Sequence, residues 1–138
     1  MIDFESIKNE IKQKTQHFHV EKSIFLKSNC DCYGNFLETE ISEIFVSVED
    51  LKKQTKNLSK TFKADGFYGE IDNRITNSGA IPDIIDFTFV VAFACAADGS
   101  PFCIDFRNDN KECIIWWDSD YWRRVADSID DFLGLIKS

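Results

Sequence analysis

The chain has 138 residues, of which 43% are apolar and 14% aromatic, and its formal net charge is −8. This length favours one domain, residues 1–138, that can bury a core without metals or disulfides, and the aromatic content excludes a disordered chain. Residues 64–138 carry 14 acidic and 6 basic residues, whereas residues 1–63 carry 10 of each. This charge argues against binding to nucleic acid phosphates, and it is compatible with simple solubility or with attraction to a basic protein partner.

The apolar segments and the cysteines indicate a cytoplasmic protein. The longest apolar run, residues 90–97, is far shorter than the roughly 20 residues that span a bilayer. The first ten residues lack the continuous apolar core of a signal peptide. The five cysteines are odd in number, and Cys30 and Cys32 are too closely spaced for an ordinary disulfide framework. We therefore expect free thiols and no contact with a membrane.

Two amphipathic helices are predicted in the first half of the chain. The first covers residues 3–18, and Asp3 supplies the acidic first turn that suits the helix dipole. Its apolar face is formed by Phe4, Ile7, Ile11 and Phe18. The second covers about residues 48–62, and Ser47 is its predicted N-cap. Its apolar stripe is formed by Val48, Leu51, Thr55, Leu58 and Phe62.

The segments around the second helix predict short strands and loops. Residues 23–26 form a short apolar run, and residues 29–35 have the composition of a loop. Residues 36–48 contain a β-like segment centred on 44–46. Beyond the helix, residues 67–71 predict a short strand, and residues 72–83 predict a loop rich in turn residues.

Three strands with short links predict an antiparallel meander. Residues 87–97 are nearly all apolar, as in a strand covered on both faces. Residues 101–107 alternate and place Phe102, Ile104 and Phe106 on one side, and residues 112–117 form a β-rich run. The turn signals at 98–101 and 108–110 are too short to join parallel neighbours.

The last segment is predicted to be helical. Apolar residues recur at helical spacing from Trp122 to Ile136, and Ser128 is a potential N-cap. We expect a short turn of helix over residues 121–126 and a true helix from about Ile129, and a continuous helix is the alternative. The fold class is therefore α+β, with an antiparallel meander flanked by N-terminal, middle and C-terminal helices, in which Phe132 and Leu133 join the core.

This order of elements resembles the SUKH superfamily, in which an Asp-Gly turn leads into a "phe-cys/leu-leu-asp" strand. The matching C-terminal elements are Asp98-Gly99, Phe102-Cys103-Ile104-Asp105, Ile115-Trp116-Trp117-Asp118 and the segment Ala126 to Leu133. Upstream, Phe25 to Asn29 resembles the family's "leu-x-x-asn-gly-gly" loop, with Cys30-Asp31 in place of the two glycines. Val46 to Leu51 resembles the "ser-leu-glu-x-leu" helix start that follows it.

The resemblance implies an α+β binding domain without shared catalytic residues. Bacterial members of the superfamily are mostly immunity proteins that bind and neutralise a cognate toxin, and a related fungal member regulates cell-wall synthesis. It thus implies two functions for this chain: neutralisation of a basic bacterial toxin, or regulation and scaffolding through a host protein. A toxin gene next to this one would favour the first.

The sequence contains few candidates for a metal site or a catalytic site. His17, His19, Cys30 and Cys32 are zinc-ligand types, but their one-residue internal spacings differ from those of structural zinc sites. Nucleophilic catalysis would need a cysteine or serine beside an oriented histidine, and no local signature indicates this. We expect no metal site, no cofactor and no enzymatic activity; a hydrolase that uses Cys30 or Cys32 is a third hypothesis.

Aromatic and acidic residues of the second half are the predicted contacts with a partner. Trp116 and Trp117 lie on opposite faces of their strand, so one of them should be core and the other is available for a contact. Acids around a tryptophan suit a partner that carries arginines. The predicted partner-binding residues are Asp98, Asp109, Trp117, Asp118 and Asp120.

Overall fold

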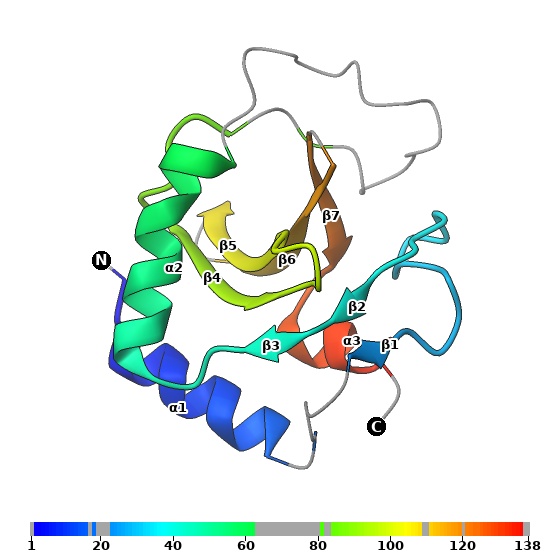
Figure 1. Ribbon diagram of the computed structural model, residues 1–138, viewed down its shortest axis with the longest axis horizontal. Coiled ribbons are helices and arrows are strands. Elements are labelled where there is room, and N and C mark those ends of the chain that lie inside the picture. Colours follow the sequence, from blue (N-terminus) through cyan, green and yellow to red (C-terminus); the bar gives the residue numbers. More distant parts are fainter. Residues whose placement is uncertain are drawn as a thin grey trace.

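Figure 1 shows the protein as a computed structural model. The structure describes residues 2–16, 18, 23–62, 81, 84–108, 111–119 and 121–136. Within these residues the chain has the predicted α+β fold, in which helices flank an antiparallel sheet. The predicted strand at 67–71 and, apart from residue 81, the predicted loop at 72–83 lie outside the described residues.

The centre of the described fold is a five-stranded antiparallel meander in the order β3-β4-β5-β6-β7. Its strands are β3 (Glu43–Ile44), β4 (Val90–Cys95), β5 (Pro101–Asn108), β6 (Lys111–Asp118) and β7 (Tyr121–Ala126). The turn between β4 and β5 contains Gly99 at φ 90°, a conformation that glycine adopts without the strain of a side chain. The predicted antiparallel pairing of β4, β5 and β6 is confirmed.

Strand β7 replaces the helical turn that was predicted for residues 121–126. That prediction was wrong, and the alternative of a continuous helix was wrong as well. Asp118 pairs with Tyr121 across a two-residue turn, in which Ser119 has a φ of 67°. This tight turn sends the chain back antiparallel to β6, so a third hairpin forms where the sequence suggested a helix.

A β-bulge explains why the spacing in β7 looked helical. The register passes from Ile115 opposite Arg124 to Ile114 opposite Ala126, which leaves Val125 as the extra residue. Val125 and Ala126 are both fully buried in the same core. Consecutive apolar residues on one side of a bulged strand resemble the i, i+3, i+4 pattern of a helix.

The second and third helices begin after the predicted caps Ser47 and Ser128, whereas Asp3, which was predicted to lie in the first turn, is itself the N-cap of the first helix. Asp3 accepts the backbone N–H of Ser6 and precedes α1 (Phe4–Thr15). Ser47 caps α2 (Val48–Thr61), and Ser128 caps α3 (Ile129–Leu133), each by accepting the N–H three residues on. These hydrogen bonds satisfy backbone donors that have no partner inside the helix.

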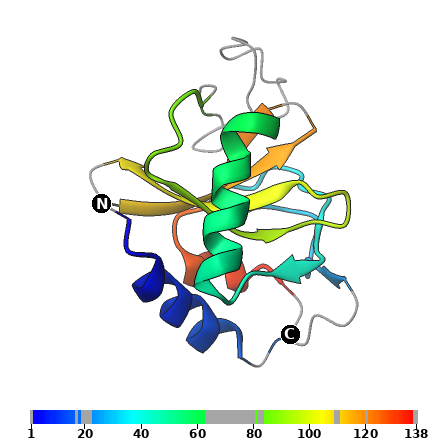
Figure 2. The same ribbon diagram turned by 60° about the vertical axis from the view of Figure 1, so that its left-hand side comes forward.

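The two faces of the meander carry separate cores, which α2 joins at one edge. The first core contains Ile7 and Ile11 of α1, Leu51 of α2, Ile129 and Phe132 of α3, and the sheet residues Val91, Phe93, Phe102, Ile104, Ile114, Trp116 and Val125. The second contains Leu58 of α2 with Ile81, Ile84, Phe87, Val90, Cys103, Ile115 and Trp122. Figure 2 shows α2 lying across the sheet. Phe102, Ile104 and Phe132 are buried as predicted, while Phe106 and Leu133 are half-buried against the first core.

A small hairpin packs beside the meander. β1 (Ile24–Phe25) pairs with β2 (Glu40–Ile41), so the predicted β-like segment 36–48 is divided between this hairpin and β3. Between the two strands the chain forms the predicted loop, which is closed by a bridge between Cys30 and Phe36.

Candidate protein-binding surface

Three of the five predicted contact residues lie at one end of the meander. Asp98 is in the β4–β5 turn, and Trp117 and Asp118 end β6. Phe102 pairs with Trp116, so the start of β5 and the end of β6 lie side by side. Asp109 and Asp120 lie outside the described residues; Asn108, which precedes Asp109, ends β5 at the opposite end of the sheet.

Asp98 presents a fixed negative charge. Its side chain is exposed, and its Oδ1 accepts hydrogen bonds from the backbone N–H of Ser100 (2.9 Å) and from the Ser100 hydroxyl (2.6 Å). These bonds lower the pKa of the Asp98 carboxyl below its usual value. Ser100 Oγ in turn accepts the indole N–H of Trp116 at 3.0 Å, which ties the turn to the first core.

Trp117 belongs partly to the core. Its ring is half-buried and meets the rings of Phe62 and Trp122 edge-on, at centroid distances of 5.9 and 5.4 Å. Trp116 is 6% exposed in the first core, so the predicted placement of the two tryptophans on opposite faces is confirmed. Only the uncovered part of Trp117 is available to a partner.

Asp118 is engaged within the chain. Its Oδ2 accepts the Tyr121 hydroxyl and Nη1 of Arg123, each at 3.1 Å. The carboxylate therefore stabilises its own hairpin, and a partner would meet it already paired with an arginine.

No sequence pattern indicated the buried ion pair that lies beyond Asp118. Arg123 Nη2 lies 2.7 Å from Asp31 Oδ2, and the two side chains are 2% and 0% exposed. Asp31 Oδ1 also accepts the backbone N–H groups of Tyr33 (2.8 Å) and Asn35 (3.0 Å). Asp31 lies in a segment with the composition of a loop, and Arg123 lies in a segment predicted to be helical, so neither had a local signal of burial.

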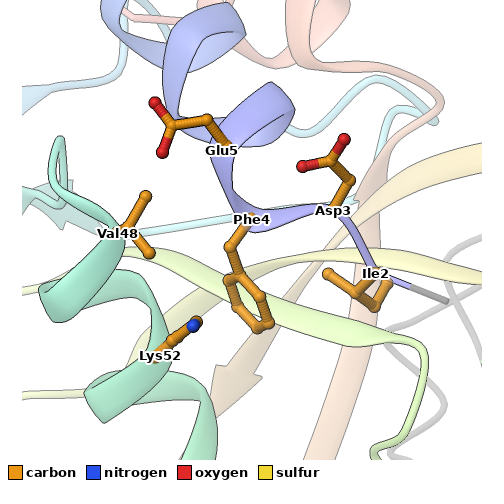
Figure 3. A pocket seen from close by; sticks show the side chains of 6 residues that line it. All are labelled: Ile2, Asp3, Phe4, Glu5, Val48 and Lys52. Carbon is orange, nitrogen blue, oxygen red and sulfur yellow. The ribbon is translucent and has the colours of Figure 1, made fainter.

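A shallow hollow of about 540 Å³ lies where α1 and α2 begin (Figure 3). It is lined by Ile2, Asp3, Phe4, Glu5, Val48 and Lys52. Lys52 Nζ lies 5.8 Å from the centroid of the Phe4 ring, a cation–π contact between the helices. Asp3 caps α1 and Glu5 pairs with Lys8 at 2.7 Å, so both acids of the lining have structural partners. The hollow contains no pair of carboxylates arranged for acid–base chemistry.

The cysteines are free thiols, and those with a shifted pKa are poor nucleophiles. Burial, together with the charges of Asp131 and Asp31, raises the pKa of Cys32 to about 11. Burial raises the pKa of the Cys103 thiol well above its usual value. A thiol that stays protonated at neutral pH reacts slowly. Among the described residues no three His, Cys, Asp or Glu gather to hold a metal ion; His17 and His19 lie outside them.

Comparison with known proteins identifies a family. A model of the SMI1 / KNR4 family (SUKH-1) matches residues 25–135, which confirms the resemblance to the SUKH superfamily. The match spans the β1–β2 hairpin, the meander and α3. Searches of curated proteins and of solved structures gave no significant match. No helix in the described ranges is long and apolar enough to cross a membrane.

Proposed function

Because the chain belongs to the SMI1 / KNR4 family (SUKH-1), which fits an immunity or regulatory role, we propose that it is an immunity protein that neutralises a cognate bacterial toxin. It acts in the cytoplasm by binding, without catalysis. The observation that supports this most directly is the ionised, exposed Asp98 at the end of the meander, in the half of the chain that holds the whole acidic excess.

The proposed mechanism is the capping of a basic active site or substrate groove. Carboxylates at the sheet end attract the toxin over long distances and speed the encounter. The exposed part of Trp117 supplies apolar contact area, and the neighbouring Asp118, which is partly exposed although it pairs with Arg123, adds to the acidic surface. Asp120 lies outside the described residues and stays a predicted contact. The raised pKa of Cys32 supports binding rather than thiol catalysis.

Co-expression with the toxin encoded by the neighbouring gene tests this function. We expect the protein to restore growth and to form a complex that is tight at low salt and weaker at high salt. Cells that remain poisoned, together with the absence of a complex at low salt, would contradict the proposal and would favour a regulatory role. Asp98→Lys should slow association with the toxin several-fold at low salt, because it reverses a charge at the end of the sheet that is proposed to meet the toxin.

The matched control for Asp98→Lys is Glu49→Lys. Glu49 is exposed in the first turn of α2, away from the turn that holds Asp98, so this variant makes the same change in net charge elsewhere. Equal slowing in both variants would show that net charge, and not the sheet end, directs the encounter.

A further inference from the structure

The β1–β2 hairpin presents two large aromatic side chains to solvent. Burial alternates along residues 36–41, where Phe36, Glu38 and Glu40 point outward and Leu37, Thr39 and Ile41 point into the protein. Phe25 pairs with Glu40 and therefore shares the outward face. Phe25 and Phe36 are 56% and 57% exposed, which is unusual for side chains that normally supply core.

We propose that this hairpin face, formed by Phe25, Phe36, Glu38 and Glu40 and continued by Asp98, is where the toxin docks. This inference rests on the proposed function and names the surface that contacts the toxin. The predicted contact residues at the end of the sheet make up only part of that surface. The partner that fits is a basic protein segment with apolar side chains between its arginines or lysines.

The hairpin face is acidic as well as aromatic. Glu40 Oε1 accepts the backbone N–H of Ala97 at 2.7 Å, and this bond places Asp98 next to the face. The face thus carries three acidic residues, Glu38, Glu40 and Asp98, against one exposed basic residue nearby, Lys27. Carboxylates between exposed aromatics are complementary to cationic side chains on either side of an apolar one.

The exposed lysines of α2 repel a basic partner and so favour its docking at the hairpin face. Helix α2 carries four exposed lysines, Lys52, Lys53, Lys56 and Lys60. Figure 1 shows α2 at the left of the sheet and β1 and β2 at the right. A basic toxin is repelled by the lysines of α2 and attracted to the hairpin face, so these charges favour docking at the hairpin over docking on the lysines of α2.

Phe36 is held rigidly, as an interface anchor should be. The backbone N–H of Leu37 donates to the carbonyl of Asn29 at 3.1 Å, and that of Asp31 donates to the carbonyl of Asn35 at 2.9 Å. Asp31 is itself fixed by its buried ion pair with Arg123. Because the backbone is already ordered, binding does not have to immobilise it, and more of the contact energy appears as affinity.

The deciding experiment compares Phe36→Ser with Ile85→Ser. Both residues are exposed, Ile85 at 66%, so both variants should fold with little loss of stability, and Ile85 lies before β4, far along the chain from the hairpin. The dissociation constant is measured with the purified product of the neighbouring toxin gene. Phe36→Ser should weaken binding by about 30-fold, as loss of a hot-spot anchor does, and Ile85→Ser by less than about twofold.

A charge reversal tests the acidic part of the face. Glu38→Lys should lower the association rate several-fold at low salt and have little effect at high salt, whereas Glu49→Lys should leave it close to that of the wild type. If the wild type protects cells and binds the toxin, but Phe36→Ser and Glu38→Lys bind it with unchanged affinity and association rate, this inference is wrong and the proposed function stands. If the wild type neither protects nor binds, both are overturned.

Discussion

The two edges of the meander are closed by different chemistry. Beyond the short strand β3, helix α2 packs against β4, and Thr55 Oγ1 accepts the N–H of Ala92 at 3.0 Å. At the other edge, the loop 30–35 crosses β7, where the Cys32 N–H donates to the Val125 carbonyl at 3.1 Å. One edge is thus covered mainly by the apolar face of a helix, and the other is sealed by a loop that a buried ion pair holds in place.

This difference determines how each edge responds to substitution. Apolar packing tolerates exchange between side chains of similar volume, whereas a buried ion pair tolerates the loss of neither partner, because the remaining charge stays buried. The ionic edge also supports the hairpin face, since Asp31 positions the turn that precedes Phe36. We therefore expect the ionic edge to link stability with binding at the proposed docking face, and the helical edge to affect stability alone.

The largest effect is expected from Asp31→Asn. The variant keeps an oxygen that can accept the N–H groups of Tyr33 and Asn35, but among the described residues it leaves the buried Arg123 with Asp118 as its one charged partner. Removing one member of a buried pair should lower the free energy of unfolding by about 3 kcal/mol. Urea denaturation followed by tryptophan fluorescence measures this difference.

Two further variants show whether the loss comes from the unpaired charge. Adding Arg123→Met to Asp31→Asn removes the stranded cation and should recover much of the lost stability. Glu38→Gln, an exposed neutralisation on the same hairpin, should change stability by no more than about 0.5 kcal/mol. A loss below about 1 kcal/mol for Asp31→Asn would mean that the loop is held by its backbone hydrogen bonds instead.

At the helical edge, Thr55→Val should have a smaller effect. Valine keeps the shape of threonine but cannot accept the N–H of Ala92, which is fully buried and is left without its partner. An unsatisfied buried donor costs about 1.5 kcal/mol. Thr55→Ser retains the hydroxyl and is the matched control. Equal stability of Thr55→Val and the wild type, measured by the same denaturation, would show that α2 seals this edge by packing alone.

The edge that could be predicted from sequence is the helical one. Its features are local: the N-cap Ser47, the apolar stripe with Leu51 and Leu58, and the apolar run that becomes β4 all follow from neighbouring residues. Short links between apolar runs were enough to predict the antiparallel pairing of β4, β5 and β6, because chain geometry allows nothing else.

The ionic edge could not be predicted, because its partners are distant in sequence. Asp31 and Arg123 are 92 residues apart, and each lies in a segment whose local pattern suggested something else. The bulge at Val125 gave β7 a helical spacing, which concealed the strand that carries Arg123. Phe36 was assigned to a β-like segment. Its exposure could not be predicted, because it depends on which face of the hairpin packs against the sheet. Of the predicted contacts that the structure describes, Asp98 alone lies beside that hairpin face.

The smallest expected effect is the contribution of the ionic edge to the alkaline pH dependence of stability. The Tyr33 hydroxyl donates to Asp127 Oδ1 at 2.6 Å, and burial, followed by this hydrogen bond, raises the pKa of Tyr33 above its usual value near 10. The folded state therefore holds the phenol proton more tightly than the unfolded chain does. The resulting stabilisation is complete below pH 10 and is lost progressively as the pH rises above it.

Tyr33→Phe should lower the free energy of unfolding slightly at pH 7. It should also make the decline in this free energy between about pH 9 and 11 shallower than in the wild type. Urea denaturation across this range measures the slope, with Thr55→Ser as the variant that should follow the wild type. Parallel curves for Tyr33→Phe and the wild type would place the alkaline sensitivity elsewhere, for example in the thiol of Cys32, whose pKa is raised to about 11 at the same edge.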